Sequence, residues 1–548
     1  MSAPNAGDTA WVLVCAGLVL FMTPGLAAFY GGMVPGRNVL AMLQQNMIAL
    51  GVVSLTWVLV GYTIAFGDDA GSGLFGNLEL FGLTDLRVPP APHLHVVDGR
   101  ITIPTLAFVL FQMMFAVITP ALVTGATAGR LKFGGWVLFL AVWSVVVYAP
   151  IAHWLWHPGG WLAKLGTQDW AGGLVVHASA GAAVVAVLLV VGRRRDWPHT
   201  AAPPNSIPLT IVGAGILWFG WFGFNGGDGL QANGVAAQAV LNTHLAAAAA
   251  MLVWLALERV TDGHSTVVGA VSGAVAGLAT VTPTAGYVNA ASAVAIGALA
   301  GLVCHFALKV KYLLRLDDAL DVLAVHFVGG MLGTLLLGLF GNRGVNPLGA
   351  DGLFLGGGGG LLWDQLVGVV SVVAFSFVLT WLIASGVQAL IGLRAPARDQ
   401  QRLDQAQQGA DAYHLGGVTS LAAPGAPRRR TGDGGVGGDQ PAAPSATRVR
   451  LVTALLEPDL ATDSADLRDA LLRAGAISVI ISDAAVASTT AAARLLPRGY
   501  WQDQPLSERL HVGVLVESDG VGAVLTELDR LGAGRADTFV QEAERIPS

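Results

Sequence analysis

The chain has 548 residues, of which 54% are hydrophobic and only 12% are charged, and its mean hydropathy is +0.62. Soluble globular proteins carry about twice that charged fraction, so the composition excludes an ordinary soluble protein and indicates several membrane spans. Cys15 and Cys304 both lie in apolar runs, which favours packing residues over a disulfide.

Eleven apolar stretches approach the roughly 20 residues that a membrane-spanning helix needs. They are residues 10–32, 40–66, 102–129, 134–154, 171–192, 206–225, 236–257, 265–281, 285–308, 319–341 and 361–392. Eleven is odd, so the two termini should lie on opposite sides of the membrane.

Lys and Arg in the loops predict which side is which. One alternate set of loops holds ten, namely Arg37, Arg130, Lys132, Arg193, Arg194, Arg195, Arg259, Lys309, Lys311 and Arg315. The other set holds four, namely Arg87, Arg100, Lys164 and Arg343. The more basic loops should be cytoplasmic, which puts the N-terminus outside and the C-terminus inside.

Two histidines occupy matching places inside these spans. In each case an Asp precedes the His by eight residues and a Gly follows by four: Asp169, His177 and Gly181 in the first half, and Asp318, His326 and Gly330 in the second. A lone histidine there is as well explained by core packing. A matched pair favours a mid-membrane site for a proton or a hydrogen-bonding small molecule, since ionisable groups are costly in a membrane.

Other motifs repeat in the same order. Phe29–Gly32 ends the first span and Phe224–Gly227 the sixth, while Thr119-Pro120 lies in the third span and Thr282-Pro283 closes the eighth. Spans one to five therefore repeat as spans six to ten, and because five is odd the second copy is inverted. Inverted repeats place a substrate path at the interface of the two halves, near the bilayer midplane.

Glycine-rich patterns have structural explanations. Gly269, Gly273 and Gly277 form a four-residue ladder, which predicts close helix packing. The run 356–360 lacks the Gly-Lys-Ser/Thr ending of a phosphate loop and predicts an external loop. The sequence contains no nucleophile–base set or metal-ligand cluster, so it predicts neither an enzyme nor a metal site.

Five segments together resemble the Amt/Rhesus family of ammonium transporters. They are Asp169–His177 (DWAGGLVVH), Gly220–Asn225 (GWFGFN), Phe111–Phe115 (FQMMF), the run GGMVPGR ending at Arg37, and Asp317–His326. The likeness covers about residues 10–413, and the Trp-Phe-Gly-Phe-Asn run favours the Amt branch. It implies an all-α polytopic membrane domain of eleven helices, a homotrimer with one pore per subunit, and conduction of ammonium or ammonia without a cofactor.

The resemblance also implies roles for individual residues. They are an outer recruitment site of Trp156, Phe111 and Phe115, a gate of Phe115 and Phe224, a pore pair of His177 and His326, Trp221 lining the pore, and Asp169 supporting the outer mouth. Aromatic faces attract cations, and neutral imidazoles can bond to ammonia and relay a proton while no full charge enters the dry pore. Without the resemblance, each phenylalanine would be interpreted as core packing and Trp156 as an interfacial residue.

Two acidic residues leave alternatives open. Asp169 precedes a helix, so it can cap the first turn as well as shape the site. Asp228 stands where the family usually has a small hydroxyl residue that faces the recruitment site. A carboxylate there would bind ammonium more tightly and slow its release, which suits a sensor. The equal alternative is that Asp228 turns into solvent.

The chain continues beyond the membrane domain, residues 1–392. Residues 393–414 resemble the Amt cytoplasmic tail, which couples neighbouring subunits in the family, although Gln400 and Gln408 replace its usual acidic residue and His. Residues 415–447 are rich in Gly, Pro, Ala and Arg and predict a flexible linker.

Residues 448–548 read as strand, helix, two strands, helix and strand, which predicts an α+β ferredoxin-like fold. The opening of this segment resembles PII signalling proteins, nitrogen regulators that bind ADP, ATP and 2-oxoglutarate. The resemblance implies ADP or ATP binding near Arg535 and Arg545, and a domain without nucleotide is an equal alternative.

We therefore expect an ammonium transporter of the cell membrane, regulated by a fused PII-like domain and a soluble nitrogen-signalling partner, with no nucleic-acid partner. The alternative is a sensor that binds ammonium without conducting it and signals to its own cytoplasmic domain.

Overall fold

The computed structural model describes residues 4–84, 102–195, 197–198, 203–413, 448–456, 471–473, 476–487, 506–517, 521–530 and 538–544. They fall into two compact units, one ending at Tyr413 and the other containing the described residues from Arg448 on. The predictions for residues 415–447, Arg535 and Arg545 concern residues that lie outside the described ones.

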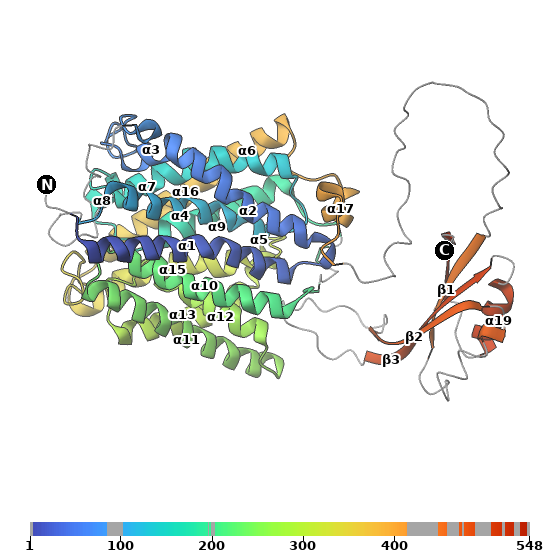
Figure 1. Ribbon diagram of the computed structural model, residues 1–548. Helices are drawn as coiled ribbons and strands as arrows, with labels where there is room; N and C mark the ends of the chain where they lie inside the picture. Colours follow the sequence, from blue (N-terminus) through green and yellow to red (C-terminus); the bar gives the residue numbers. More distant parts are fainter. Residues whose placement is uncertain are drawn as a thin grey trace, which may run out of the picture. The chain divides into compact units, whose positions relative to one another are not determined.

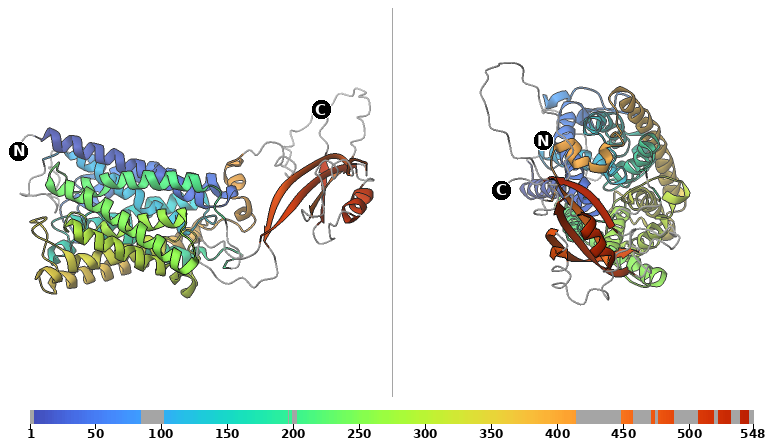
Figure 2. Two further views of the ribbon diagram at one scale, coloured as in Figure 1. Left: turned by 90° about the horizontal axis from the view of Figure 1, so that it is seen from below. Right: turned by 90° about the vertical axis from the view of Figure 1, so that its right-hand side faces the viewer.

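The first unit is a bundle of long helices that run along one common direction (Figures 1 and 2). Its helices are α1 (Ala6–Met33), α2 (Val39–Thr56), α3 (Tyr62–Phe66), α4 (Thr105–Ala121), α5 (Val123–Ala126), α6 (Phe133–Trp143), α7 (Ala149–Trp156), α8 (Trp161–Leu165), α9 (Ser179–Val191), α10 (Ile207–Gly227), α11 (Gly234–Asp262), α12 (Val267–Val281), α13 (Ala290–Ala307), α14 (Val310–Leu313), α15 (Gly329–Phe340), α16 (Gly360–Leu390) and α17 (Leu403–Gln408). We call the end where α1 begins the N-terminal end and the end that carries α17 the tail end.

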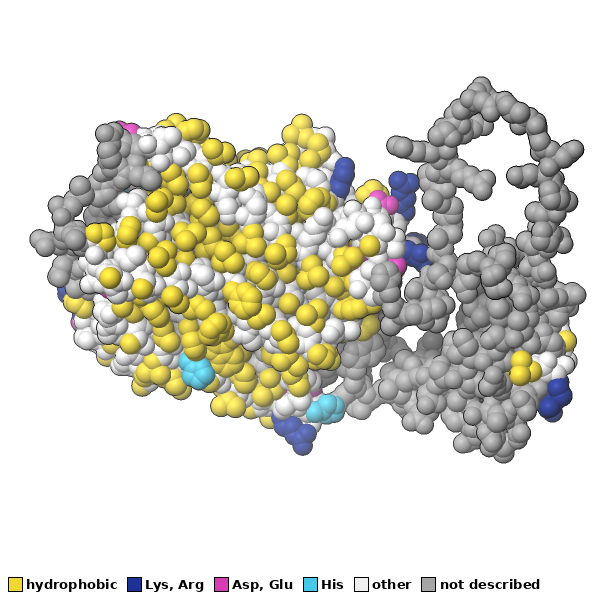
Figure 3. Space-filling view, viewed as in Figure 1, with side chains coloured by type: hydrophobic (Ala, Val, Ile, Leu, Met, Phe, Trp, Pro, Cys, Tyr) yellow, Lys and Arg dark blue, Asp and Glu magenta, His cyan; other side chains and the backbone are white. Residues whose placement is uncertain are grey.

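Ten described helical segments are long and apolar enough to cross a membrane. The predicted span 265–281 corresponds to α12, which is shorter than these ten with 15 residues. It ends at Val281, two residues before Pro283, because the proline ring has no amide hydrogen with which to continue the helical hydrogen bonds. Hydrophobic side chains cover the flank of the bundle in Figure 3, as lipid contact requires.

The first helices of the two predicted repeats pack against each other along their length. A Cβ atom on Gly213 of α10 would lie 2.2 Å from the backbone nitrogen of Phe29 on α1, so glycine permits this close approach. The predicted glycine ladder of α12 also packs as expected, because a Cβ on Gly277 would lie 2.4 Å from the Ala246 carbonyl oxygen of α11.

The tail after α16 packs onto its own chain. The Asp404 carboxylate of α17 accepts hydrogen bonds from the Leu40 and Ala41 amides at the start of α2, at 2.9 and 2.8 Å. The Ala395 amide bonds to the Arg130 carbonyl at 2.7 Å. These contacts make residues 393–413 part of the helical unit.

The second unit contains a four-stranded antiparallel sheet with strand order β2-β3-β1-β4. The strands are β1 (Arg448–Leu456), β2 (Ala476–Ala487), β3 (Leu506–Glu517) and β4 (Thr538–Glu544), and helix α19 (Val521–Arg530) connects β3 to β4. Each strand overlaps a predicted one.

A buried ion-pair cluster closes the tail end of the bundle. The Arg194 Nη2 atom lies 2.6 Å and the Arg130 Nη1 atom 3.3 Å from the Asp317 carboxylate, and the Arg130 and Asp317 side chains are both fully buried. Burial alone would raise the pKa of Asp317, but hydrogen bonds from Arg194 and the charge of Arg130 outweigh it and lower that pKa.

We expect Asp317→Ala to lower the free energy of unfolding by about 3–5 kcal/mol, because it leaves the buried Arg130 without its counter-charge. Thermal unfolding in detergent measures this effect. Asp399→Ala is the matched control, since it removes a partly exposed carboxylate whose partner, Arg398, is solvent-exposed, and it should change stability little. Equal shifts for both variants would contradict a structural role for the cluster.

Candidate functional site

Each predicted histidine lies in a short π-helical segment that begins deep in the bundle. His177 lies in Gly173–Ala178, directly before α9, and His326 lies in Leu323–Val328, directly before α15. π-Helical turns inside α-helices are rare and often occur at functional sites. Both halves therefore use the same local geometry to place a histidine.

The Asp that precedes each histidine caps the segment. The Asp169 carboxylate accepts hydrogen bonds from the four consecutive amides of residues 172–175, at 3.1, 2.6, 2.8 and 3.0 Å. Asp318 accepts a bond from the Leu323 amide at 2.7 Å. The capping alternative for Asp169 is thus confirmed.

The two histidines meet in the core of the bundle. Their Nδ1 atoms lie 3.2 Å apart, and their ring centroids are 5.2 Å apart. In this contact one Nδ1 must donate and the other accept, so a single proton lies between the two rings. The Trp221 indole stacks on His177 at 5.6 Å and donates its Nε1 hydrogen to Thr282 at 2.9 Å.

The glycines that follow the histidines explain how the two segments fit together. A Cβ atom on Gly181 would lie 2.3 Å from the Cβ of Phe327, the residue next to His326. A Cβ on Gly330 would lie 2.7 Å from the Cβ of His177. Each half thus presses a glycine against the histidine region of the other, and any larger residue would separate them.

Aromatic side chains continue from the histidines toward the N-terminal end. Phe224 lies 6.2 Å from the His177 ring and 4.2 Å from the Phe115 ring. Phe115 in turn contacts Phe111 at 5.0 Å and Trp156 at 5.7 Å, both edge-on. The structure therefore brings the predicted aromatic and histidine residues into one continuous column.

Two of the predicted acidic residues lie near the aromatic end of this column. The Trp156 indole donates to the Asp169 carbonyl at 2.9 Å, which ties this tryptophan to the capping residue. Asp228 is fully buried at the C-terminal end of α10. A Cβ on the preceding residue, Gly227, would lie 2.7 Å from the Phe111 ring. The alternative that Asp228 turns into solvent is therefore wrong.

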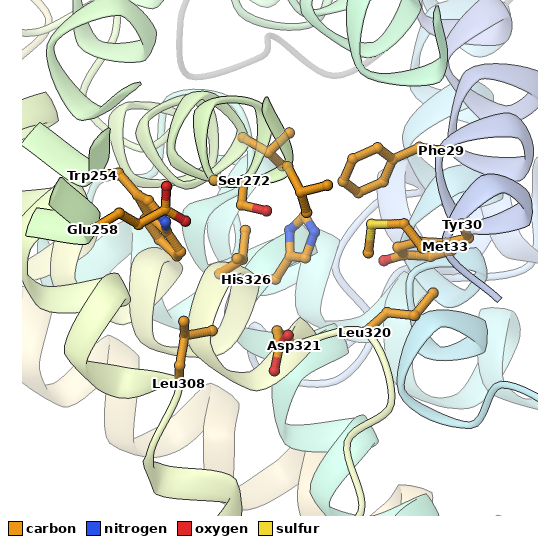
Figure 4. Close-up of a pocket in the computed structure, with 14 residues that line it drawn as sticks. Phe29, Tyr30, Met33, Trp254, Glu258, Ser272, Leu308, Leu320, Asp321 and His326 are labelled. Atoms are coloured by element: carbon orange, nitrogen blue, oxygen red, sulfur yellow. The ribbon is translucent and has the colours of Figure 1, made fainter. Parts of the chain in front are cut away.

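The space around the histidines is narrow and almost wholly apolar. A cavity of about 10 Å³ touches both His177 and His326 and is otherwise lined by residues such as Leu26, Phe224 and Val275. A second cavity of about 40 Å³ lies on the tail side of His326 and includes the carboxylates of Glu258 and Asp321 (Figure 4). Each holds only one or a few water-sized molecules.

Several neighbouring polar residues were missed by the sequence analysis. Thr282 orients Trp221, and Glu258 reaches the tail-side cavity while accepting a bond from the Thr266 amide at 2.8 Å. Glu258 directly follows the predicted span 236–257, and an acidic residue at the very edge of a span is a signal that could have identified it. Within the described residues, no group of three or more His, Cys, Asp or Glu could hold a metal ion.

Known proteins resemble the chain over this helical unit. The sequence profile of the Ammonium Transporter Family matches residues 10–413. An ammonium transporter of Mycobacterium bovis is 45% identical over 75% of this chain and 91% of its own length, and one of Bacillus subtilis is 43% identical over 74% and 98%.

Solved structures agree in fold. Candida albicans Mep2 superposes with a TM-score of 0.68 and 32% identity, covering 76% of this chain and 95% of that one. A structure described as a sensor Amt protein superposes with a TM-score of 0.66 and 29% identity, covering 73% and 98%.

We expect Asp169→Ala to lower the free energy of unfolding by at least about 2 kcal/mol, because four buried amides lose a charged acceptor. The matched control is Asn289→Ala, which removes a neutral cap that accepts from the single amide of Ser292, and should lower stability by about 1 kcal/mol. Thermal unfolding compares the two, and a smaller loss for Asp169→Ala would contradict the capping role.

Proposed function

This chain belongs to the ammonium transporter family, and we propose that it carries ammonium nitrogen across a cell membrane through the column of aromatic and histidine residues. The observation that carries this proposal is the buried His177–His326 pair at the foot of the aromatic stack, with a Nδ1–Nδ1 distance of 3.2 Å. Neutral imidazoles in an apolar passage can bond to ammonia and relay a proton.

The column suggests a sequence of steps. Ammonium is recruited beside Trp156, Phe111 and Phe115, where aromatic faces attract the cation as it loses water. The Phe115–Phe224 contact closes the passage to hydrated ions, since the rings lie 4.2 Å apart and must turn to let a molecule through. Beyond it, only the histidines are ionisable among the residues lining the 10 Å³ cavity. Passage as neutral ammonia, with the proton moved separately, avoids burying a charge.

The buried Asp228 adds a negative charge to the recruitment site. Tyr148 and Tyr287 both lie within electrostatic range of Asp228 and Asp169. This outer mouth therefore carries two carboxylates among aromatic side chains. Such a group attracts a monovalent cation strongly, because the surroundings screen charge less than water does.

We assign the N-terminal end to the outside and the tail end to the cytoplasm, and propose a homotrimer with one pore per subunit. The N-terminus and α17 lie at opposite ends of the bundle, which supports placing them on opposite sides of the membrane (Figure 1). The excess of basic loop residues supports the cytoplasmic assignment.

The second unit is proposed to be a PII-like regulatory domain. Its antiparallel order β2-β3-β1-β4 is the one that two interleaved β-α-β units produce, which supports the ferredoxin-like plan. Binding of ADP or ATP through Arg535 and Arg545, and contact with a soluble nitrogen-signalling partner, extend this proposal.

Transport is tested by an ammonium jump applied to proteoliposomes that contain the full chain. We expect a saturable uptake of radiolabelled methylammonium, with a current that sodium and potassium do not produce. We expect His177→Ala combined with His326→Ala to lose either the flux or the selectivity for ammonium over potassium, because the hydrogen-bonding relay is gone.

The matched control is His305→Ala, which removes a histidine of α13 that contacts Trp254 and lies outside the column. It should leave flux and selectivity unchanged. Wild-type selectivity in the double variant would refute the relay. Binding without uptake by the wild-type chain would favour the sensor alternative instead.

Asp228→Ser restores the small hydroxyl and removes the charge. We expect the half-saturating ammonium concentration to rise by about tenfold or more, because the cation loses a partly desolvated counter-charge. Asp364→Ser is the matched control, since Asp364 is a partly exposed carboxylate at the start of α16. An unchanged half-saturating concentration would remove Asp228 from the recruitment site, and a higher maximal flux would indicate that Asp228 slows release.

A further inference from the structure

A large basic cavity opens at the tail end of the helical unit. Its volume is about 950 Å³, and it is lined by five arginines, namely Arg37, Arg194, Arg195, Arg394 and Arg398. No acidic side chain is among the described residues that line it. We call this cavity the arginine vestibule.

Most of this positive charge is available to a ligand. Arg194 is paired with Asp317, and the exposed Arg398 lies 3.3 Å from Asp399. Arg37 and Arg195 are exposed, and no interaction with a described acidic residue joins either of them. An excess of guanidinium groups around one hollow creates a positive potential that favours a multiply charged anion.

Two parts of the vestibule wall are held in place. Arg394 is fixed by bonds from its two Nη atoms to the carbonyls of Val191 and Arg193, at 2.7 and 2.8 Å. Trp197, which also lines the vestibule, stacks on Tyr312 at 5.9 Å. Because these parts are already positioned, ordering them costs little entropy when a ligand binds.

We propose that the arginine vestibule binds a nucleoside polyphosphate. Guanidinium groups bind phosphate oxygens through paired hydrogen bonds, and several of them around one cavity match a chain of phosphates. The volume exceeds what a single phosphate fills and suits a ligand the size of a nucleotide. Asn38, Gln400 and Gln401 supply neutral hydrogen-bonding groups on the same wall.

The vestibule lies at the mouth of the path. Leu320 lines both the vestibule and the cavity beside His326, so the two spaces are adjacent at this residue. A ligand held between the tail arginines and Arg37 therefore covers the tail-side exit. This consequence rests on the proposed transport, whereas the binding itself does not.

The test uses the full chain in phosphatidylcholine nanodiscs with radiolabelled ATP. We expect saturable binding that inorganic tripolyphosphate displaces and adenosine does not. Arg37→Gln combined with Arg195→Gln should weaken ATP binding by about tenfold or more, because two charged contacts are lost. Both side chains are exposed, so the fold should persist, and thermal unfolding verifies this.

Two control variants identify the binding site. Arg259→Gln removes an arginine whose guanidinium bonds to the Gly263 carbonyl at the end of α11, outside the vestibule, and should leave binding unchanged. The vestibule substitutions are also made in a chain that carries Arg535→Gln with Arg545→Gln, which removes the nucleotide contacts proposed for the second unit and should leave ATP binding to the vestibule in place. ATP binding that survives the vestibule substitutions in this background, or that is already absent from the background itself, overturns the proposal.

Two further measurements distinguish a free nucleotide from a lipid headgroup and determine the effect of ATP on uptake. Loss of ATP binding in discs that contain phosphatidylinositol bisphosphate would assign the site to a lipid headgroup. That result would overturn the proposal that a nucleotide is the ligand. In proteoliposomes, ATP on the tail side should lower methylammonium uptake in the wild type but not in the vestibule variant. Uptake measured without ATP tests transport itself. If saturating ATP leaves the uptake unchanged, a ligand in the vestibule does not cover the exit.

Discussion

The structure depends on how a charged group is stabilised inside an apolar bundle. Asp169 is buried, yet four backbone amides at the start of its helix surround its carboxylate. A helix can begin at a buried position only where its free amides find acceptors, and Asp169 supplies them. The π-helical turn that follows then fixes the direction of His177. Asp318 begins the equivalent segment at the other end, so the histidine pair is a consequence of two buried caps.

Charge is distributed unequally along the bundle. Asp169 and Asp228 lie beside the aromatic rings at one end of the column, and an apolar cavity with two imidazoles follows. A cavity that includes the carboxylates of Glu258 and Asp321 comes next, and arginines surround the tail-side mouth. The arrangement favours a neutral molecule in the middle and makes the tail-side mouth sensitive to any anion bound there.

The sequence predicted the spans and the pairing of the two halves, because apolar length and repeated motifs are local properties. It also predicted the residues of the column, through the family likeness. It could not predict the Arg130–Asp317–Arg194 cluster, whose members are distant in sequence and meet only in the fold. The burial of Asp228 depends in the same way on the close approach of Gly227 to Phe111. The short α12 reflects Pro283, whose position was known but whose effect on helix length was not anticipated.

The reciprocal packing of Gly181 and Gly330 limits how the molecule can move. Each glycine lies against the opposite half with no room for even a methyl group, so a rocking motion of one half against the other would break the tightest contacts of the core. Alternating exposure of a central site through large rigid-body rearrangement is therefore disfavoured. The backbone acts as a fixed frame, so rotation of single side chains is the motion that this packing leaves available.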